Sequence, residues 1–524
     1  MENIYFIMLI ALTILAVFDI VVGVSNDAIN FLNSAIGSKA ISMRTIMIVA
    51  SLGIFIGAVF SSGMMEVARK GIFVPAMFTF DEIMMIFMTV MITDILLLDF
   101  FNTLGLPTST TVSIVFNLLG AAVVVSLIKI SNNDAQTVAE LGNYINTEKA
   151  LMIIKGILMS VVIAFSCGAL VQWVSRLIFT FNYENKIKNF GAIFGGISLT
   201  AILYFIIMKG LKGSPFYREI KGLVNGNEFL IIIAGLVLFS VLSFVFQKLT
   251  KKSILLVVIA VGTFGLALAF SGNDLVNFIG VPMAAYHSYE AWEASGVLPT
   301  EFTMEVLSKK MPAEPFLLFI AGGIMVVTLW LSKKARTVAE TEINLSRQGD
   351  TDERFDANFV SRGIVNISTA IASGVSKVIP ADVRTKIDKS FERPNQVIGS
   401  PDNPDAPAFD MIRASINLVV AGVLISIATT LKLPLSTTYV TFMVAMGTSL
   451  ADRAWGRESA VYRIAGVLNV IGGWFLTAFG AFTAAGIVVF FVHLSKEIAI
   501  PILLVLTAVI LIKNYQSHKK KKVQ

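Results

Sequence analysis

Two stretches of the chain place a carboxylate among amide side chains at the same spacing. The first is VSNDAIN at residues 24–30 and the second is SGNDLVN at residues 271–277, and both follow long apolar runs. A carboxylate with amide and backbone carbonyl oxygens suits a hard cation such as Na⁺, or a proton if the aspartate titrates. Sodium is the expected ion, because a proton carrier needs the carboxylate but not the surrounding amides.

Helical geometry gathers these side chains on one face. At about 100° per residue, Asn26, Asn30 and Asn33 fall close together with Asp27 beside them. Gly280 takes the place of the third amide in the second copy. An ionisable group inside a membrane costs at least about 2.5–3.5 kcal/mol, so it usually marks a function. The alternative is that each motif only caps a helix start, although capping alone does not require an asparagine one turn later.

A second repeated motif, Pro-x-Ser-Thr-Thr, offers the complementary chemistry. It occurs in GLPTSTT at 105–111 and in KLPLSTT at 432–438, where Pro107 and Pro434 are placed to break or begin a helix. The hydroxyl and backbone N–H groups that follow can then point to one place. A helix N-terminus binds an anion without lysine or arginine, and neither Pro-x-Ser-Thr-Thr motif contains one. Alternatively, the hydroxyls bond to their own backbone or pack between membrane helices.

The two motifs recur in the same order, with a different separation in each half. Asp27 precedes Pro107 by 80 residues (107 − 27), whereas Asp274 precedes Pro434 by 160 (434 − 274). The surplus nearly equals the hydrophilic stretch 333–410, which has 78 residues (410 − 333 + 1) and no counterpart in the first half. These spacings predict two homologous membrane halves with an insertion in the second. About seven crossings separate the acidic motifs, and an odd number predicts an inverted repeat.

Composition identifies the elements that must position these motifs. Hydrophobic residues make up 56% of the 524 and charged residues only 15%, against roughly 25% charged in soluble domains. We predict an all-α polytopic membrane protein of about 12 transmembrane helices, with broken or re-entrant half-helices at the midplane. The membrane-length apolar runs lie at 4–24, 44–62, 83–100, 110–128, 151–180, 190–208, 229–247, 254–270, 315–332, 411–431, 436–450, 461–492 and 497–512.

The net charge and the small numbers of cysteine and histidine exclude several classes of function. The single cysteine, Cys167, excludes an internal disulfide. One cysteine and three histidines also argue against a transition-metal site. The formal charge of +6 is explained by basic loops and the KKKK tail at 519–522. Positive charge retained on the cytoplasmic side accounts for it better than nucleic acid does. We therefore expect a multi-pass protein of the cell membrane, with the insertion and the C-terminal tail in the cytoplasm.

The insertion contains a stripe of apolar residues at three- and four-residue steps, which predicts an amphipathic helix that lies on the membrane or packs on the transporter. A small regulatory domain is the alternative. The stripe consists of Val360, Ile364, Ile367, Ile371, Val375 and Val378.

The predicted division of the chain is a first membrane repeat at 1–208, a connecting loop and helix at 209–252, the first part of the second repeat at 253–332, the insertion at 333–410, the second part of the second repeat at 411–495, and a last helix with a basic tail at 496–524.

The paired motifs resemble those of the inorganic phosphate transporter family of sodium- or proton-coupled symporters. The likeness covers both membrane halves, everything but the insertion and the tail. The family's usual Gly-Ala-Asn-Asp reads Val-Ser-Asn-Asp at 24–27 and Ser-Gly-Asn-Asp at 271–274, which indicates a divergent, bacterial-type branch.

The resemblance implies symport of inorganic phosphate with Na⁺ by alternating access, and no enzymatic activity. The cation ligands that it implies are Asp27, Asn30, Asp274 and Asn277. The phosphate ligands that it implies are Asn26, Ser109, Thr110, Thr111, Asn273, Ser436, Thr437 and Thr438. No cofactor is expected beyond the coupling ion, with H⁺ as the alternative to Na⁺. The expected partners are phosphate and the lipid bilayer, not nucleic acid, and a homodimer stays open.

Other functions stay open at this point. A proton-coupled permease for phosphate, or for sulfate or another oxyanion, is the nearest alternative. An intramembrane hydrolase and a channel are more distant, since no histidine lies near either Ser-Thr-Thr triplet to act as a base. Asp94, Asp99 and Asn102 precede the first triplet and are further candidates for the same cavity. Asp99 and Asn102 could equally mark the membrane–water boundary.

Overall fold

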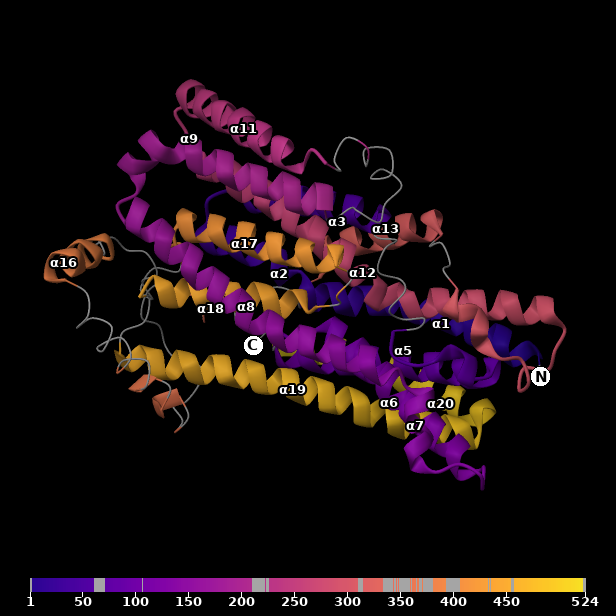
Figure 1. Ribbon diagram of the computed structural model, residues 1–524. Coiled ribbons are helices and arrows are strands. Elements are labelled where there is room, and N and C mark those ends of the chain that lie inside the picture. The colour runs from indigo at the N-terminus through magenta and orange to yellow at the C-terminus, as the bar shows by residue number, and fades with distance from the viewer. Residues whose placement is uncertain are drawn as a thin grey trace.

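The computed structural model is a bundle of long helices that lie along one another (Figure 1). It describes residues 2–60, 71–105, 107–209, 222, 226–309, 314–332, 380–392, 406–431, 433, 435–453 and 457–521, with scattered positions between 343 and 370. Among them, ten helices of at least 18 residues are apolar enough to cross a membrane, and two shorter apolar helices accompany them. The predicted class of a helical, multi-pass membrane protein is confirmed.

Burial separates inner helices from outer ones. In α5 (Phe80–Leu104), 83% of the most apolar stretch is buried, and in α17 (Met411–Thr430) the share is 72%. The corresponding share is 6% in α11 (Glu228–Thr250) and 11% in the apolar part of α20 (Lys496–Lys521). Because the outer helices expose leucine, isoleucine, valine and phenylalanine, their surfaces are suited to lipid and the polar motifs lie on the inner helices. The other outer helices are α8 (Thr147–Phe179) and α19 (Arg457–Leu494), whereas half of the most apolar stretch that includes α9 (Glu184–Ala201) is buried.

The helices that carry the two acidic motifs run antiparallel. α1 (Glu2–Asp27) ends at the first aspartate, and α2 (Ile29–Ser38) continues after a break at Ala28. α12 (Leu255–Ser295) runs unbroken through the second motif. The ring of Tyr5, near the start of α1, lies 5.3 Å from that of Trp292, near the end of α12. α3 (Met43–Val59) and α13 (Pro315–Leu331) pack beside this pair.

The capping interpretation of the acidic motifs is wrong. Ser25 lies inside α1, where its hydroxyl donates to Val21 O at 2.6 Å, and Asn273 lies in the middle of α12. The apolar runs before both motifs are themselves helical, and α2, which begins at Ile29, has no side-chain cap at Ala28. The polar side chains therefore belong to the interior of the bundle.

The two Pro-x-Ser-Thr-Thr motifs each connect a pair of inner helices. α5 is followed by Gly105, whose φ of 67° favours glycine, and α6 (Thr110–Ser131) begins five residues after that glycine, with Pro107 in the break. Ser109 caps α6 by accepting from Val112 N at 3.1 Å. In the second pair Ser436 caps α18 (Thr437–Ala451) by accepting from Tyr439 N, also at 3.1 Å. Pro434 lies outside the described residues.

These two helical hairpins enter the bundle from opposite ends. α5 begins beside the N-terminus of α1, where Tyr5 Oη donates to Asp81 Oδ1 at 2.7 Å. α17 begins at the other end, where Asp410 pairs with Arg176 near the end of α8. Figure 1 shows the α5–α6 pair near the N-terminus and the α17–α18 pair toward α16 (Ala381–Ser390). The tips of the hairpins therefore meet inside the bundle.

Each hairpin packs closely on an outer helix through a glycine. Gly120 of α6 lies against the backbone of Phe482 in α19, and Gly447 of α18 lies against the backbone of Phe165 in α8. Both glycines follow the proline of their motif by 13 residues (120 − 107 and 447 − 434). The equivalent contacts place the two hairpins in equivalent surroundings.

The insertion is only partly described. α16 lies in it, and Arg453 Nη1, just after α18, forms an ion pair with Asp388 Oδ1 at 2.9 Å. All six residues of the predicted apolar stripe lie outside the described residues. The amphipathic helix and the division of the chain into segments remain predictions.

Candidate functional site

The first aspartate lies where the two hairpin tips meet. Asp27 Oδ2 accepts from the hydroxyl of Thr110 at 2.8 Å, at the start of α6. Asp27 Oδ1 accepts from Thr438 at 3.0 Å, at the start of α18, and from Asn26 Nδ2 at 2.9 Å. The carboxylate therefore receives donors from both halves of the chain.

The second aspartate has the counterparts of these three donors with the halves exchanged, and Asn277 Nδ2 also donates to it at 3.2 Å. Asp274 Oδ2 accepts from the hydroxyl of Thr437 at 2.5 Å. Asp274 Oδ1 accepts from Thr111 at 3.1 Å and from Asn273 Nδ2 at 2.9 Å. Each bond to Asp27 thus has a counterpart at Asp274.

The amides complete this symmetric arrangement. Asn30 Nδ2 donates to Thr438 Oγ1 at 3.0 Å, and Asn277 Nδ2 donates to Thr111 Oγ1 at 2.9 Å. Asn26 Nδ2 also bonds to Thr108 O at 2.7 Å, just as Asn273 Nδ2 bonds to Leu435 O at 3.2 Å. The structure therefore brings all the sequence-predicted site residues into one place, with Ser109 and Ser436 as the caps that hold the two helix starts.

This site is buried, and among the residues that the structure describes it holds two acidic groups and no basic side chain. Every aspartate, asparagine and threonine named above as a site residue is at most 4% exposed. Among the described residues, the side chains that donate to Asp27 and Asp274 are threonines and asparagines only. Burying a carboxylate costs several kcal/mol unless a charge compensates it. The arrangement is suited to cations at the carboxylates and to an anion at the helix starts, whose dipoles are positive.

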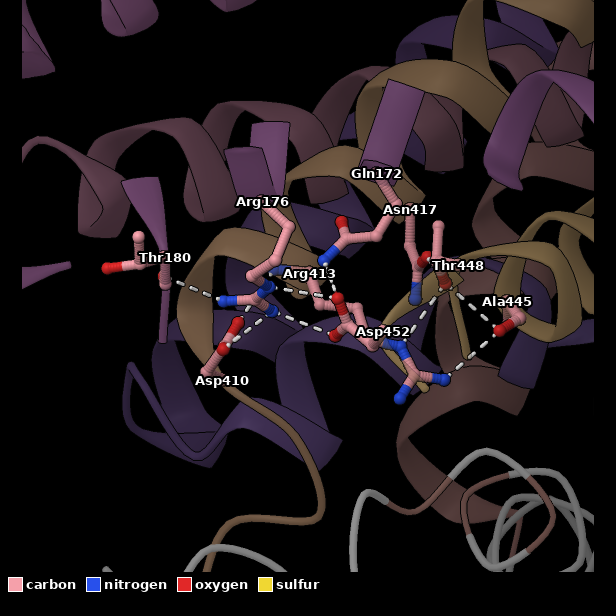
Figure 2. Close-up of polar contacts among 9 residues, drawn as sticks. All are labelled: Gln172, Arg176, Thr180, Asp410, Arg413, Asn417, Ala445, Thr448 and Asp452. Atoms are coloured by element: carbon pink, nitrogen blue, oxygen red, sulfur yellow. Dashed lines mark hydrogen bonds and ion pairs between the residues drawn. The ribbon is translucent and has the colours of Figure 1, made fainter. Parts of the chain in front are cut away.

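A second buried polar network, which the sequence did not suggest, joins three helices at the end of the bundle where α17 begins (Figure 2). Arg176 of α8 contacts Asp452 through Nε at 2.9 Å and through Nη2 at 2.8 Å. Its Nη2 also lies 2.8 Å from Asp410 Oδ2. Gln172 Nε2 donates to Asp452 Oδ1 at 2.6 Å. Burial alone raises the pKa of the Asp452 carboxyl, but the adjacent guanidinium outweighs burial and holds that pKa below its usual value.

The same network ties α17 to α18. Arg413 Nε donates to Thr448 Oγ1 at 3.2 Å, and Thr448 donates to Asn417 Oδ1 at 2.7 Å (Figure 2). Isolated charges within apolar runs were the only sequence signal for it. The network connects α18, which begins at the site, to α8 and α17.

The three further candidates for the cavity, Asp94, Asp99 and Asn102 of α5, point to different places. Asn102 Nδ2 donates to Val22 O at 2.9 Å and clamps α5 to α1, and Asp99 accepts from Asn514 Nδ2 at 2.7 Å. Asp94 instead accepts from Ser113 of α6. Only Asp94 therefore points into the polar region next to the site.

The chain matches the model of the Phosphate transporter family over residues 23–343. This match includes both acidic motifs and ends before the second Pro-x-Ser-Thr-Thr motif. "Putative phosphate permease TK2061" of Thermococcus kodakarensis is 26% identical over 315 residues, which is 58% of this chain and 69% of that protein. "Putative phosphate permease PF1020" of Pyrococcus furiosus is 25% identical over 368 residues, 67% of this chain and 80% of that protein.

A solved structure has the same fold. The structure titled "The sodium-dependent phosphate transporter" matches with a TM-score of 0.61 over 93% of this chain and 99% of that chain. The two sequences are 20% identical. The arrangement of helices described above is therefore shared with a protein of known structure.

Proposed function

Because the chain belongs to the phosphate transporter family and crosses the membrane many times, we propose that it is a sodium-coupled symporter of inorganic phosphate. The observation that carries this proposal is the exchange of donors between the halves. Each buried aspartate is held by threonines of both hairpins, so a cation there acts on both hairpins at once. Because the family consists of transporters, the chain is a transporter and not an enzyme.

The proposal assigns the acidic motifs to sodium and the hairpin tips to phosphate. Carboxylate and amide oxygens are ligands that suit a hard cation. The proposed sodium ligands are Asp27, Asn30, Asp274 and Asn277. The proposed phosphate ligands are Asn26, Ser109, Thr110, Thr111, Asn273, Ser436, Thr437 and Thr438.

Coupling follows from the donors that the two ions share. Thr110 and Thr437 donate their hydroxyl hydrogens to the aspartates. Sodium at a carboxylate takes the place of that donor, and the freed hydroxyl can then donate to phosphate. Two sodium charges also compensate the anion, for which the described part of the site provides no basic side chain. Phosphate therefore binds well only after sodium, and neither ion crosses alone.

The geometry of the halves supports alternating access by an inverted repeat. The acidic helices are antiparallel, the hairpins enter from opposite ends, and each of the three side-chain bonds to Asp27 has a counterpart at Asp274. Two such halves that rock about a central site expose it to either side in turn. We place the protein in the cell membrane, with the insertion and the tail in the cytoplasm.

Uptake of radiolabelled phosphate into proteoliposomes tests the proposal. We expect uptake with an inward sodium gradient to exceed uptake with equal choline at least tenfold, with sodium and phosphate each saturable. Active vesicles that take up phosphate on a proton gradient alone would establish the proton-coupled alternative. Inhibition by excess sulfate with matching sulfate uptake would redirect the assignment to another oxyanion.

A further inference from the structure

A pair of buried carboxyl groups lies beside the proposed transport site and takes no part in it. Asp19 of α1 and Asp94 of α5 have no exposed surface, and their side chains face each other at hydrogen-bonding range. Asp94 Oδ1 accepts from the hydroxyl of Ser113 and from Asn117 Nδ2 at 2.9 Å, both on α6. Thr93 donates to Asn117 Oδ1 at 3.0 Å and so orients that amide toward Asp94.

Three of the four carboxylate oxygens in this pair receive no hydrogen bond from any other residue that the structure describes. They are both oxygens of Asp19 and Oδ2 of Asp94, and all three are buried. Within the part of the chain that the structure describes, neither carboxyl forms an ion pair with lysine, arginine or histidine. Like charges at this range repel, and their burial costs several kcal/mol each unless a cation compensates them.

The fold itself does not require polar side chains at these positions. The corresponding positions of the second half follow from the same offsets to Asp274 and Pro434, and all four are buried and apolar. They are Leu266, Ala421, Val440 and Val444. Because the second half packs with apolar residues where the first half has Asp19, Asp94, Ser113 and Asn117, these polar residues serve a purpose other than packing.

We propose that Asp19 and Asp94 bind a sodium ion in addition to those of the transport site. A proton shared between the two residues would join one oxygen of Asp19 to one oxygen of Asp94. The last of the three unbonded oxygens would then still have no partner. Sodium is a hard cation that takes several oxygen ligands at once, so it can be held by all three. Thr110, which donates to Asp27, lies one helical turn from Ser113, which donates to Asp94. An ion in this asymmetric site would therefore neighbour the transport site on one side only.

Equilibrium binding of ²²Na⁺ to the purified full-length protein in phosphate-free choline buffer tests this site. The starting variant carries Asp27→Asn and Asp274→Asn, which removes both carboxylates of the transport site. We expect it to retain one sodium per chain at saturation, and we expect Asp94→Asn in that background to lose it. Asp99→Asn is the matched control, because Asp99 is also buried on α5 but already accepts from Asn514 at 2.7 Å.

Folding and ion identity are checked separately. In the protein without substitutions, sodium should raise the unfolding temperature relative to choline, and Asp19→Asn should reduce that rise while eluting as a single peak on gel filtration. Equal sodium binding with and without Asp94→Asn would overturn the proposal. A starting variant that binds no sodium but takes up one proton fewer after Asp94→Asn would also overturn it, in favour of a shared proton. This binding site does not rest on the proposed function. If sodium did not drive phosphate uptake, the binding measurement would still detect the sodium ion that depends on Asp94.

Discussion

At the residue scale, the site is defined by hydroxyls that bridge the halves. Thr438 donates to Asp27 and accepts from Asn30, although it lies 411 residues from the aspartate in the sequence. Its counterpart Thr111 holds the same two roles at Asp274 and Asn277. A change at one of these residues should therefore affect both ion and substrate binding.

Asp27→Asn should abolish sodium-driven phosphate uptake. The amide keeps the size of the side chain but cannot neutralise a sodium ion, so the free energy that drives accumulation is lost. The initial rate of uptake at several sodium concentrations measures this effect. Asp99→Asn should behave like the unsubstituted protein. If Asp27→Asn kept the full sodium dependence, Asp27 would not be a sodium ligand.

Thr438→Val should weaken transport without unfolding the protein. Valine has the shape of threonine but lacks the hydroxyl that donates to Asp27. A hydrogen bond to a charged group contributes about 1.5–3 kcal/mol, which corresponds to roughly a tenfold to hundredfold fall in kcat/KM for phosphate.

The same substitution at Thr263 is the control for Thr438→Val. Thr263 is also buried, and within the described part of the chain its hydroxyl donates to Ile259 O of its own helix, at 2.7 Å. Its replacement should change kcat/KM less than threefold. Equal losses in the two variants would mean that the hydroxyl of Thr438 has no special role.

At the element scale, buried charges hold the second hairpin to its neighbours. α18 starts at the transport site and ends at Asp452, which binds Arg176 of α8 through two hydrogen bonds (Figure 2). A shift of α18 relative to α8 would have to break this pair. The network therefore couples the position of the hairpin tip to the packing of its far end.

Asp452→Asn should lower the free energy of unfolding by roughly 3 kcal/mol, because it leaves the buried Arg176 with one carboxylate instead of two. Asp388→Asn is the control, since Asp388 pairs with Arg453 at the surface and should contribute under about 1 kcal/mol. Thermal and denaturant unfolding in detergent measure both. Equal effects of the two substitutions would contradict a stabilising role for the buried pair.

The pH dependence of that difference follows from the lowered pKa of Asp452. A carboxyl whose pKa is lower in the folded state contributes its full stability above its ordinary pKa of about 4 and loses it as the pH falls below that value. The difference in the free energy of unfolding between Asp452→Asn and the unsubstituted protein should therefore be constant from neutral pH down to about pH 5. At lower pH that difference should shrink.

At the scale of the whole molecule, the proposed transport cycle is electrogenic. If two sodium ions move with one phosphate monoanion, a tenfold sodium gradient supplies about 2.8 kcal/mol. A potential of about 100 mV that acts on the net charge adds roughly 2.3 kcal/mol. The total supports accumulation of several thousandfold, so phosphate uptake should respond to both the gradient and the voltage.

Sidedness can be measured with cysteines placed in the insertion and the tail. In a Cys167→Ser background, Ser346→Cys and Ser517→Cys should both react with a membrane-impermeant maleimide only after the membrane is opened to the cytoplasmic side. The C-terminal lysines favour this orientation. Labelling of either cysteine from outside intact cells would overturn the cytoplasmic placement of that segment.

The sequence determined the features that depend on local order. Apolar runs predicted the membrane helices, because backbone groups in lipid must bond within their own segment. The repeated motifs predicted which residues form the site. The local sequence also left a helix cap as an alternative for both motifs. The continuous helix through Asp274 and the absence of a side-chain cap on α2 exclude it.

Only the tertiary structure decided the partners. Asp27 binds Thr438, and Asp274 binds Thr111, across the boundary between the halves. Nothing in the spacing of either motif specifies this exchange, because it arises from two hairpins that enter the bundle from opposite ends. The pairing of Arg176 with Asp452 and the facing of Asp19 with Asp94 were hidden for the same reason. A single charge in an apolar run has no partner that local sequence can reveal, since packing between distant helices supplies it.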